Sequence, residues 1–266
     1  GSRNLPVADL VREAEAIAAK GQREIVLTGI NVGDFGRTTG ESFVDLLRAL
    51  DAVGGIDRYR ISSIEPNLLT DEVIAFTAGS DKFHPHFHVP LQSGCDRILA
   101  LMRRRYNTAR FAERIGAVRT QIPGVFFGID VIVGFPGETD EDFEVPCRFL
   151  EEIRPAFLHV FPYSVRPNTP AAEMNGKVAP GVAAHRVQRL GELSSRLYRG
   201  FCAVQQGREA KVLWESTRRG GDMFGFTENY IKVRTPFDRE RINTITRVRL
   251  GALDADGVAQ ATILCE

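Results

Sequence analysis

The sequence has few cysteines and no long apolar segment. Its four cysteines stand at positions 95, 147, 202 and 265, too far apart for a disulfide framework, and no two form a Cys-x-x-Cys pair. No apolar run approaches the length of a membrane span, and the opening "GSRNLPVADL" has no signal-peptide core. We therefore expect a cytoplasmic protein that makes no membrane contact.

Net charge and repetition are also absent. The 34 basic and 34 acidic residues cancel, so any nucleic-acid surface must be a local patch. We find no internal repeat and no low-complexity segment. At 266 residues, with 43% hydrophobic content, the chain suits one large globular domain or a medium domain with a small one.

The first three quarters of the chain alternate between two hydrophobic patterns. Helical spacing recurs between β-rich runs, which predicts a parallel sheet with right-handed crossovers, either doubly wound or a barrel. A ligand site in such folds gathers where the strands end. The five expected strands span residues 24–30, 58–65, 86–92, 126–135 and 157–164.

From about residue 208 the pattern changes to short alternating strands separated by turn residues such as Gly220 and Gly257. This pattern is typical of a small antiparallel β-barrel. We expect a parallel α/β domain over 1–207 and a β-barrel domain over 208–266.

One stretch, "HPHFHVPLQSGCD" at 84–96, places His84, His86 and His88 on alternate positions. On a strand the three imidazoles share one face, as zinc ligands could. The alternative is a strand that enters a polar pocket.

Several strings together identify a family. In order along the chain, "EIVLTGI", "RISSIEP", "HVPLQSG", "LMRRRY", "DVIVGFPGET", "HVFPYSVRPNTPAA" and "GFTENYIKV" resemble the radical S-adenosylmethionine (SAM) methylthiotransferases. The resemblance implies an incomplete radical SAM (β/α) barrel followed by a TRAM-like β-barrel that binds RNA. "RISSIEP" and "HVFPYSVRPNTPAA" look most like the branch that acts on N6-threonylcarbamoyladenosine beside the tRNA anticodon.

The chain also departs from this family. The family has an amino-terminal domain that binds a 4Fe-4S cluster, and a Cys-x3-Cys-x2-Cys loop that holds a second one. Neither is present, and the four cysteines lack the necessary spacing. We therefore expect the carboxyl-terminal part of such an enzyme, inactive alone, whose two clusters are bound elsewhere in the full-length protein.

The cofactor residues are expected at the strand ends. The resemblance places Thr28, Gly29 and Asn31 near the methionine part of SAM, and adenine beside 133–135. Strand alternation places Ser63 and Glu65 together on the inward face of their strand. Asp130 is a polar residue in an apolar strand, where it needs a polar partner or water. The resemblance makes 86–92 the fourth barrel strand, with Gln92 and Ser93 at its SAM-facing end. We expect the histidines of this strand to satisfy neighbouring polar groups rather than bind zinc, so we assign no metal ligand and no catalytic residue. The remaining candidates for SAM are Ser63, Glu65, Gln92, Ser93, Gly134 and Phe135.

The RNA contacts are expected from basic residues mixed with aromatic ones, which stack on unpaired bases. We expect Phe224 and Phe226 to fill the barrel core. The candidates are Arg103, Arg104, Arg105, Arg218, Arg219, Tyr230, Lys232 and Arg234. The tRNA anticodon stem-loop is the expected partner.

Three alternatives stay open. A related radical SAM enzyme could act on isopentenyladenosine tRNA or on a ribosomal protein. A cluster-free protein could bind RNA without catalysis. A zinc enzyme could use His84, His86 and His88.

Overall fold

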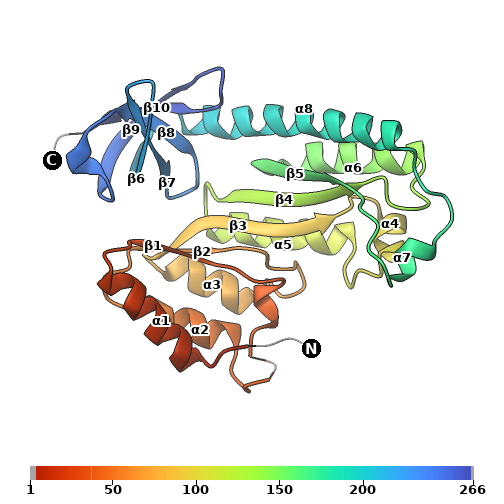
Figure 1. The fold of residues 1–266 in the computed structure, drawn as a ribbon, viewed down its shortest axis with the longest axis horizontal. Coiled ribbons are helices and arrows are strands. Elements are labelled where there is room, and N and C mark those ends of the chain that lie inside the picture. The colour runs from red at the N-terminus through yellow and green to blue at the C-terminus, as the bar shows by residue number, and fades with distance from the viewer. Residues whose placement is uncertain (1–3, 37, 265–266) are drawn as a thin grey trace.

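The computed structural model describes residues 4–36 and 38–264. Its first sheet has five parallel strands in the order of the chain, so every crossover turns the same way. Figure 1 shows helices covering one face of this sheet. The strands are β1 (Glu24–Leu27), β2 (Arg58–Ile61), β3 (Phe83–Gln92), β4 (Phe126–Val133) and β5 (Phe157–Pro162). The expected partial parallel barrel is therefore confirmed.

The covering helices begin where the sequence supplies caps. Ser42 and Thr139 each accept a hydrogen bond from the backbone of the third helical residue, whose aspartate returns one to the cap. The helices are α1 (Val7–Ala19), α2 (Phe43–Asp51), α3 (Asp71–Gly79), α4 (Asp96–Leu101), α5 (Thr108–Gln121), α6 (Asp140–Ile153), α7 (Pro170–Glu173) and α8 (Pro180–Gln205). Short 3-10 turns lie at Val32–Asp34 and Arg239–Arg241. Among the described residues, no helix is long and apolar enough to cross a membrane.

The sheet has two different faces because side chains alternate along each strand. Phe87, Val89 and Ile129 are fully buried against the helices. The intervening positions, including His88 and Asp130, point to the opposite face, which we call the inner face. The inner face therefore carries the polar side chains of the strands.

The second sheet closes into a barrel in the order β10-β8-β7-β6-β9. Its strands are β6 (Glu209–Arg219), β7 (Asp222–Thr227), β8 (Lys232–Pro236), β9 (Ile245–Leu253) and β10 (Ala259–Ile263). The expected small β-barrel is present, and its sheet is mixed rather than purely antiparallel, because β10 runs parallel to β8. A short turn joins β7 to β8.

The barrel core also differs from expectation. Met223, Val233 and Trp214 fill it, whereas Phe224 and Phe226 occupy the opposite alternation and are only partly buried. Aromatic content alone does not fix which face of a strand is buried. The bulge between Trp214 and Arg218 and the pairing of β7 with β6 and β8 set that register.

Two arginines join the barrel to the parallel sheet. Arg58 and Arg60, each 1% exposed, extend from the inner face of β2. Arg58 donates to the carbonyls of Phe226 and Lys211, at 2.9 and 2.8 Å. Arg60 donates to the carbonyls of Glu228 and Thr227, at 2.8 and 3.0 Å. Figure 1 shows the barrel at the end where β3 and β4 begin.

Candidate cofactor site at the carboxyl edge of the sheet

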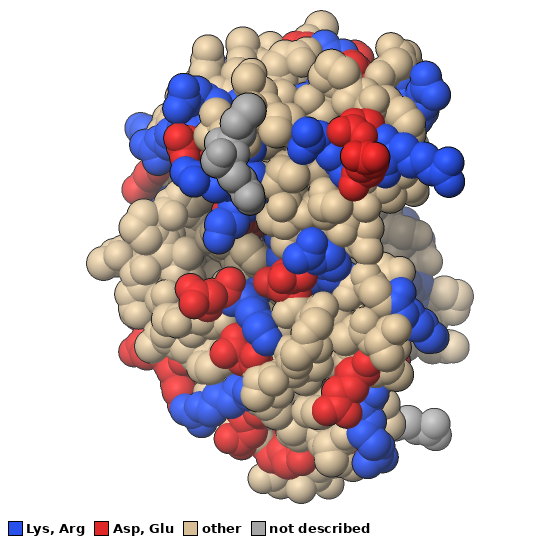
Figure 2. All heavy atoms as spheres, turned by 90° about the vertical axis from the view of Figure 1, so that its left-hand side faces the viewer, with Lys and Arg blue, Asp and Glu red and all other residues tan. Residues whose placement is uncertain are grey.

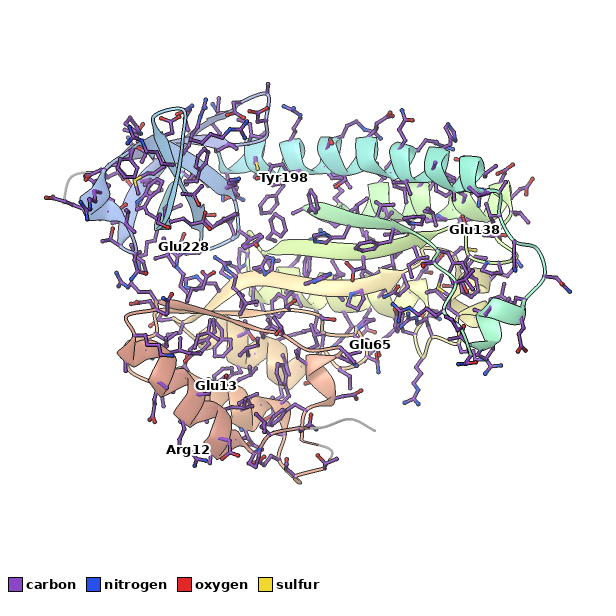
Figure 3. The ribbon with its side chains drawn as sticks, in the orientation of Figure 1. Arg12, Glu13, Glu65, Glu138, Tyr198 and Glu228 are labelled. Carbon is purple, nitrogen blue, oxygen red and sulfur yellow. The ribbon has the colours of Figure 1, made fainter. Side chains whose placement is uncertain are left out.

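The ends of β2, β3 and β4 turn through unusual backbone conformations at one edge. Ser63 has φ 57° and Gln92 has φ 68°, in the left-handed region that few non-glycine residues adopt, and Gly134 has φ 75°. Such strain persists where surrounding contacts impose it, often at functional sites. Figure 3 shows Glu65 and Glu138 toward this edge, away from Tyr198 and Glu228 at the barrel.

The loops after β1 and β2 hold each other by hydrogen bonds. Ser63 donates through its hydroxyl to the carbonyl of Ile30 at 3.1 Å, and Asn31 accepts from the backbone N–H of Glu65 at 3.2 Å. Glu65 in turn pairs with Arg104 at 3.4 Å. Since β2 ends at Ile61, Ser63 and Glu65 lie in a loop, and strand alternation does not aim them inward as expected.

Thr28, Gly29 and Asn31 line a separate pocket of about 770 Å³ beside the free edge of β1. Its walls are largely the apolar side chains of α1, α2 and β1, including Leu10 and Ile17. The predicted methionine contacts therefore do not share a cavity with Gly134.

The end of β3 is fixed by Tyr106. Its buried hydroxyl donates toward the carbonyls of Pro90 and Leu91, at 2.9 and 3.2 Å, and burial raises its pKa. Gln92 remains partly exposed, but Ser93 is 4% exposed and its hydroxyl accepts from the backbone N–H of Cys95. The structure thus gives Ser93 a local structural role and leaves Gln92 available to a ligand.

A pocket of about 540 Å³ opens at the ends of β4 and β5. Gly134, Pro136, Tyr163 and Val178 are among its mainly apolar lining residues. The Tyr163 hydroxyl is buried and has no hydrogen-bond partner among the described residues. Apolar walls with an unused polar group suit an aromatic base such as adenine. Phe135 does not line this pocket; it is buried against Cys95 and Ile98.

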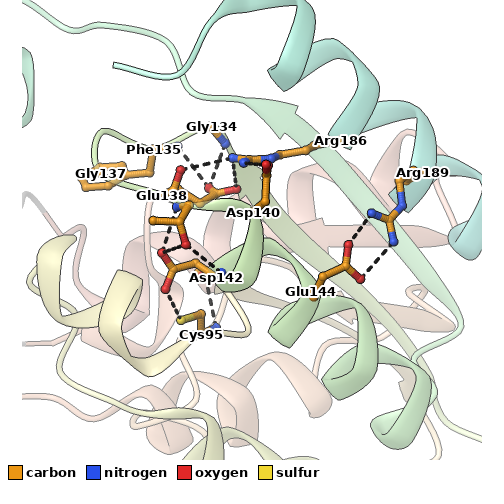
Figure 4. A network of polar contacts seen from close by, with 12 residues as sticks. Cys95, Gly134, Phe135, Gly137, Glu138, Asp140, Asp142, Glu144, Arg186 and Arg189 are labelled. Atoms are coloured by element: carbon orange, nitrogen blue, oxygen red, sulfur yellow. Dashed lines mark hydrogen bonds and ion pairs between the residues drawn. The ribbon is translucent and has the colours of Figure 1, made fainter. Parts of the chain in front are cut away.

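Glu138 holds the loop that forms this pocket. It accepts hydrogen bonds from the backbone N–H groups of Gly134 and Phe135, at 2.8 and 3.2 Å, and one from Arg186 of α8 at 2.8 Å. Figure 4 shows this carboxylate between the loop and the helix. Burial raises the pKa of Glu138, while Arg186 opposes that change. Glu138 therefore links the loop after β4 to α8.

Next to it, the first turn of α6 is tied to α4. Arg97 donates to both carboxylate oxygens of Asp142 and to the carbonyl of Gly137. This contact and the Thr139 cap hold the pKa of Asp142 well below its usual range. The loop between β4 and α6 is consequently fixed at both ends.

The inner face brings together three side chains from three strands. His88 and Asp130 lie 2.6 Å apart through Nε2 and Oδ1, and the ring of His159 is 5.1 Å from that of His88. Asp130 is thus placed beside two histidines in mid-strand, four residues before Gly134. At about 3.3 Å per residue, it lies roughly 13 Å below the edge where SAM was expected.

The three histidines of β3 share the inner face, as strand alternation predicts, but they have different neighbours. His86 lies against Phe126 and Tyr230, with ring centroids 5.4 and 4.3 Å away. Burial, with the positive charge of Arg60, lowers the pKa of His86 to about 3. Burial and Arg58 likewise lower the pKa of His84 to about 3.

The predicted RNA contacts divide into free and engaged residues. Arg103 and Arg105 are exposed on the loop after α4, whereas Arg104 is engaged with Glu65. Tyr230 packs on His86 and Phe226 and beneath Arg60, in the junction between sheet and barrel. Its ring therefore has several side-chain neighbours within the protein, although Tyr230 remains 36% exposed.

On the barrel, Arg218, Arg219 and Lys232 are exposed. Lys232 lies over the ring of Phe224, and Arg218 over that of Phe237, at 5.2 and 4.8 Å. Arg234 is paired with Asp222 and Asp254. Figure 2 shows basic side chains interspersed with acidic ones over the barrel end.

Sequence reasoning missed Arg58, Arg60 and Arg186. Arg58 and Arg60 alternate with Tyr59 and Ile61 in "RYRI", so their shared face was readable, but nothing local showed that the barrel would cover it. Arg186 is one of several basic residues on α8. Only the tertiary fold distinguishes it from the exposed ones.

Comparison with known proteins defines the class. Residues 1–150 match the Radical SAM superfamily, and the chain belongs to it. Its curated relatives are methylthiotransferases of that superfamily. The chain is 38% identical, over 248 residues, to the threonylcarbamoyladenosine tRNA methylthiotransferase MtaB of Bacillus subtilis, covering 91% of this chain and 55% of that protein. It is 44% identical, over 207 residues, to a tRNA-2-methylthio-N(6)-dimethylallyladenosine synthase of Thermobifida fusca. This alignment covers 77% of this chain and 42% of that protein. The chain thus spans about half the length of these relatives.

Solved structures agree on the fold. The radical SAM methyltransferase TsrM from Kitasatospora setae matches with a TM-score of 0.53 at 16% identity, over 63% of this chain and 33% of that one. The coproporphyrinogen III oxidase HemN from Escherichia coli, a radical SAM enzyme, matches with a TM-score of 0.54 at 17% identity, over 71% and 46%. At these identities the likeness concerns architecture alone.

The superfamily implies SAM and a 4Fe-4S cluster. The pocket at Gly134, with its apolar walls and the unpartnered hydroxyl of Tyr163, fits the adenine of SAM. A cluster requires thiolates close together. The described cysteines do not fit it, because Cys95, Cys147 and Cys202 form no ligand group; Cys265 lies outside the described residues.

Proposed function

We propose that the protein to which this chain belongs adds a methylthio group to C2 of N6-threonylcarbamoyladenosine in tRNA, beside the anticodon. The observation that supports it is coverage. The relatives named for this nucleoside align over 91% of the chain for the Bacillus subtilis protein and 96% for the Thermotoga maritima protein, at 38% and 33% identity. These alignments are long enough to include much of the barrel.

A second candidate is dimethylallyladenosine in tRNA. The higher identity of 44% favours it, although that alignment covers only 77% of the chain. The two substrates differ in the group attached to N6, which is polar and carries a carboxylate in one case and is apolar in the other. The Arg104–Glu65 pair at the carboxyl edge supports a polar group, because it places a charged donor and acceptor there.

Within this proposal the chain's residues bind and orient. Gly134, Pro136, Tyr163 and Val178 would hold the adenine of SAM. Gln92, partly exposed at the end of β3, would contact the polar part of SAM. SAM, when bound and reduced, supplies a carbon-centred radical, and the protein positions the reactants and excludes water. We also propose that residues 1–207 and 208–266 are separate domains, and that Arg103, Arg105, Arg218, Arg219 and Lys232 contact tRNA phosphates and bases.

The test is mass spectrometry of nucleosides from tRNA of cells that lack the full-length gene. We expect the methylthiolated form of threonylcarbamoyladenosine to disappear and its precursor to accumulate, with recovery on complementation. Loss of the methylthiolated dimethylallyladenosine instead would establish the second candidate. If both nucleosides were unchanged, neither tRNA proposal would stand.

A further inference from the structure

The inner face of the sheet carries a group of side chains that SAM binding at the edge leaves unused. His88 of β3, Asp130 of β4 and His159 of β5 each offer one ligand atom, and these atoms lie within 4.8 Å of one another. The strand register brings them together, because Asp130 pairs with His159 on one side and Gly128 pairs with His88 on the other. Two imidazoles and one carboxylate are a donor set that divalent transition metals prefer.

The hydrogen bonding of the group is incomplete. Asp130 makes one hydrogen bond, to His88, and His159 makes none to the described residues. No lysine or arginine among the described residues forms an ion pair with Asp130, whose side chain is only 20% exposed. A largely buried carboxylate needs a compensating cation. The hydrogen bond between His88 and Asp130 does not explain why the imidazole of His159 also lies beside this carboxylate.

The space around the group is also kept open. Gly128 faces the inner side between His88 and His159, and a Cβ there would stand 3.4 Å from Nε2 of His159. Its backbone is not in the left-handed region, so the conformation does not demand glycine. Glycine inside a strand weakens it and often marks a close approach of another group. The missing side chain leaves room beside the two imidazoles.

From this geometry we infer that His88, Asp130 and His159 form a binding site for one divalent transition-metal ion of the zinc type. Ligands about 2.1 Å from such an ion are roughly 3.4 Å apart in a tetrahedral site. The His88–Asp130 contact of 2.6 Å therefore opens by less than about 1 Å when the ion enters. Three protein ligands leave one position open toward the inner face.

The ion would lie at mid-strand, below the carboxyl edge of the sheet. It uses only one histidine of the "HPHFH" stretch, together with residues 42 and 71 positions further along the chain, which is why sequence spacing did not reveal it. The inference concerns this chain alone and does not rest on the proposed tRNA substrate.

The test is metal binding by the purified, tag-free chain after treatment with a chelator. Co²⁺ is titrated by its visible absorption, and Zn²⁺ is measured by displacing it. We expect one ion per chain, and an affinity more than about 100-fold weaker for Asp130→Asn and His159→Gln, since even loss of an outer-shell partner can cost up to about that factor. His84→Gln, on the same strand and face, and His185→Gln, exposed on α8, are the matched controls and should bind as the unaltered chain does.

Thermal unfolding shows whether each variant is folded. If the ligand variants unfold, Gly128→Val keeps the inference testable, because it retains all three ligands and fills the space between the imidazoles. That variant should also bind more weakly. Absence of Co²⁺ and Zn²⁺ binding, or equal binding by all variants, would overturn the inference; the tRNA nucleoside test is unaffected by either result.

Discussion

Replacing Arg60 by alanine tests whether the barrel is rigidly attached to the parallel sheet. Arg60 is 1% exposed, donates to two barrel carbonyls, pairs with Glu24 at 3.1 Å and lies 4.8 Å from the ring centre of Tyr230. The substitution leaves the carbonyls of Thr227 and Glu228 without this donor, and removes the closest cation from Glu24. Removing one partner of a buried ion pair costs about 3–5 kcal/mol. Since the barrel has its own apolar core, we expect the loss to fall on the junction.

The assay is unfolding by denaturant, followed by the fluorescence of Trp214, the only tryptophan, and by circular dichroism. Trp214 reports on the barrel because it is buried in the barrel core. For Arg60→Ala we expect the two signals to separate, whereas those of the unaltered chain coincide. Arg196→Ala, at an exposed ion pair on α8, is the control and should cost less than about 1 kcal/mol. A single shared transition within about 0.5 kcal/mol of the unaltered chain would refute the reasoning.

Three further predictions concern the site and its surroundings. The folded state favours the neutral form of His86, so the contribution of His86 to the free energy of unfolding is complete above its unfolded pKa of 6.5 and is lost as the pH falls toward about 3. At pH 5 the loss is about 2 kcal/mol. His86→Phe should therefore flatten the dependence of stability on pH between pH 7 and 5, while His185→Phe should not. Gly134→Ala should lower the free energy of unfolding by about 1–2 kcal/mol, because position 134 has a positive φ. It should also weaken SAM binding, measured by calorimetry, because the new Cβ would lie 3.1 Å from the Cβ of Ala183. Unchanged affinity would place SAM elsewhere. Glu138→Gln leaves Arg186 without its buried carboxylate and should cost about 3 kcal/mol in denaturant unfolding, and a cost below about 1 kcal/mol would show that Asp140 alone compensates Arg186.

The architecture of the parallel sheet was predictable because its signals are local. Helix caps, glycine stops and the change of hydrophobic period mark many of the elements. All five expected strands are present; β1, β2, β4 and β5 end earlier than expected, whereas β3 begins three residues earlier, at Phe83. Helix α4 ends at Leu101, and two residues further on Arg103 takes a left-handed conformation with φ 56°. That turn aims Tyr106 at the end of β3, a tertiary contact that propensity does not contain.

The site was less predictable because it depends on contacts between distant segments. Gly134 could be recognised as a glycine that allows close approach of another group, but the Glu138–Arg186 ion pair joins residues 48 positions apart. Likewise, strand alternation placed His88 and Asp130 on the inward face without showing that they meet. Alternation gives a direction for each side chain, while register between strands decides its partner.

Register also sets the distances along the inner face. His86 touches the barrel through Tyr230, His88 belongs to the group with Asp130 two residues further on, and Gln92 reaches the carboxyl edge. At about 3.3 Å per residue, the six residues from His86 to Gln92 span roughly 20 Å. All three lie on β3, so the spacing between barrel, inner face and edge is fixed by one strand, provided that the barrel does not move.

If tRNA binds to the barrel as proposed, a base directed to the edge must pass His88 and Asp130. Arg60→Ala should therefore reduce methylthiolation by the full-length protein even though Arg60 lies far from the edge. Full activity in that variant, combined with a loosened barrel, would show that tRNA reaches the edge without guidance from the barrel.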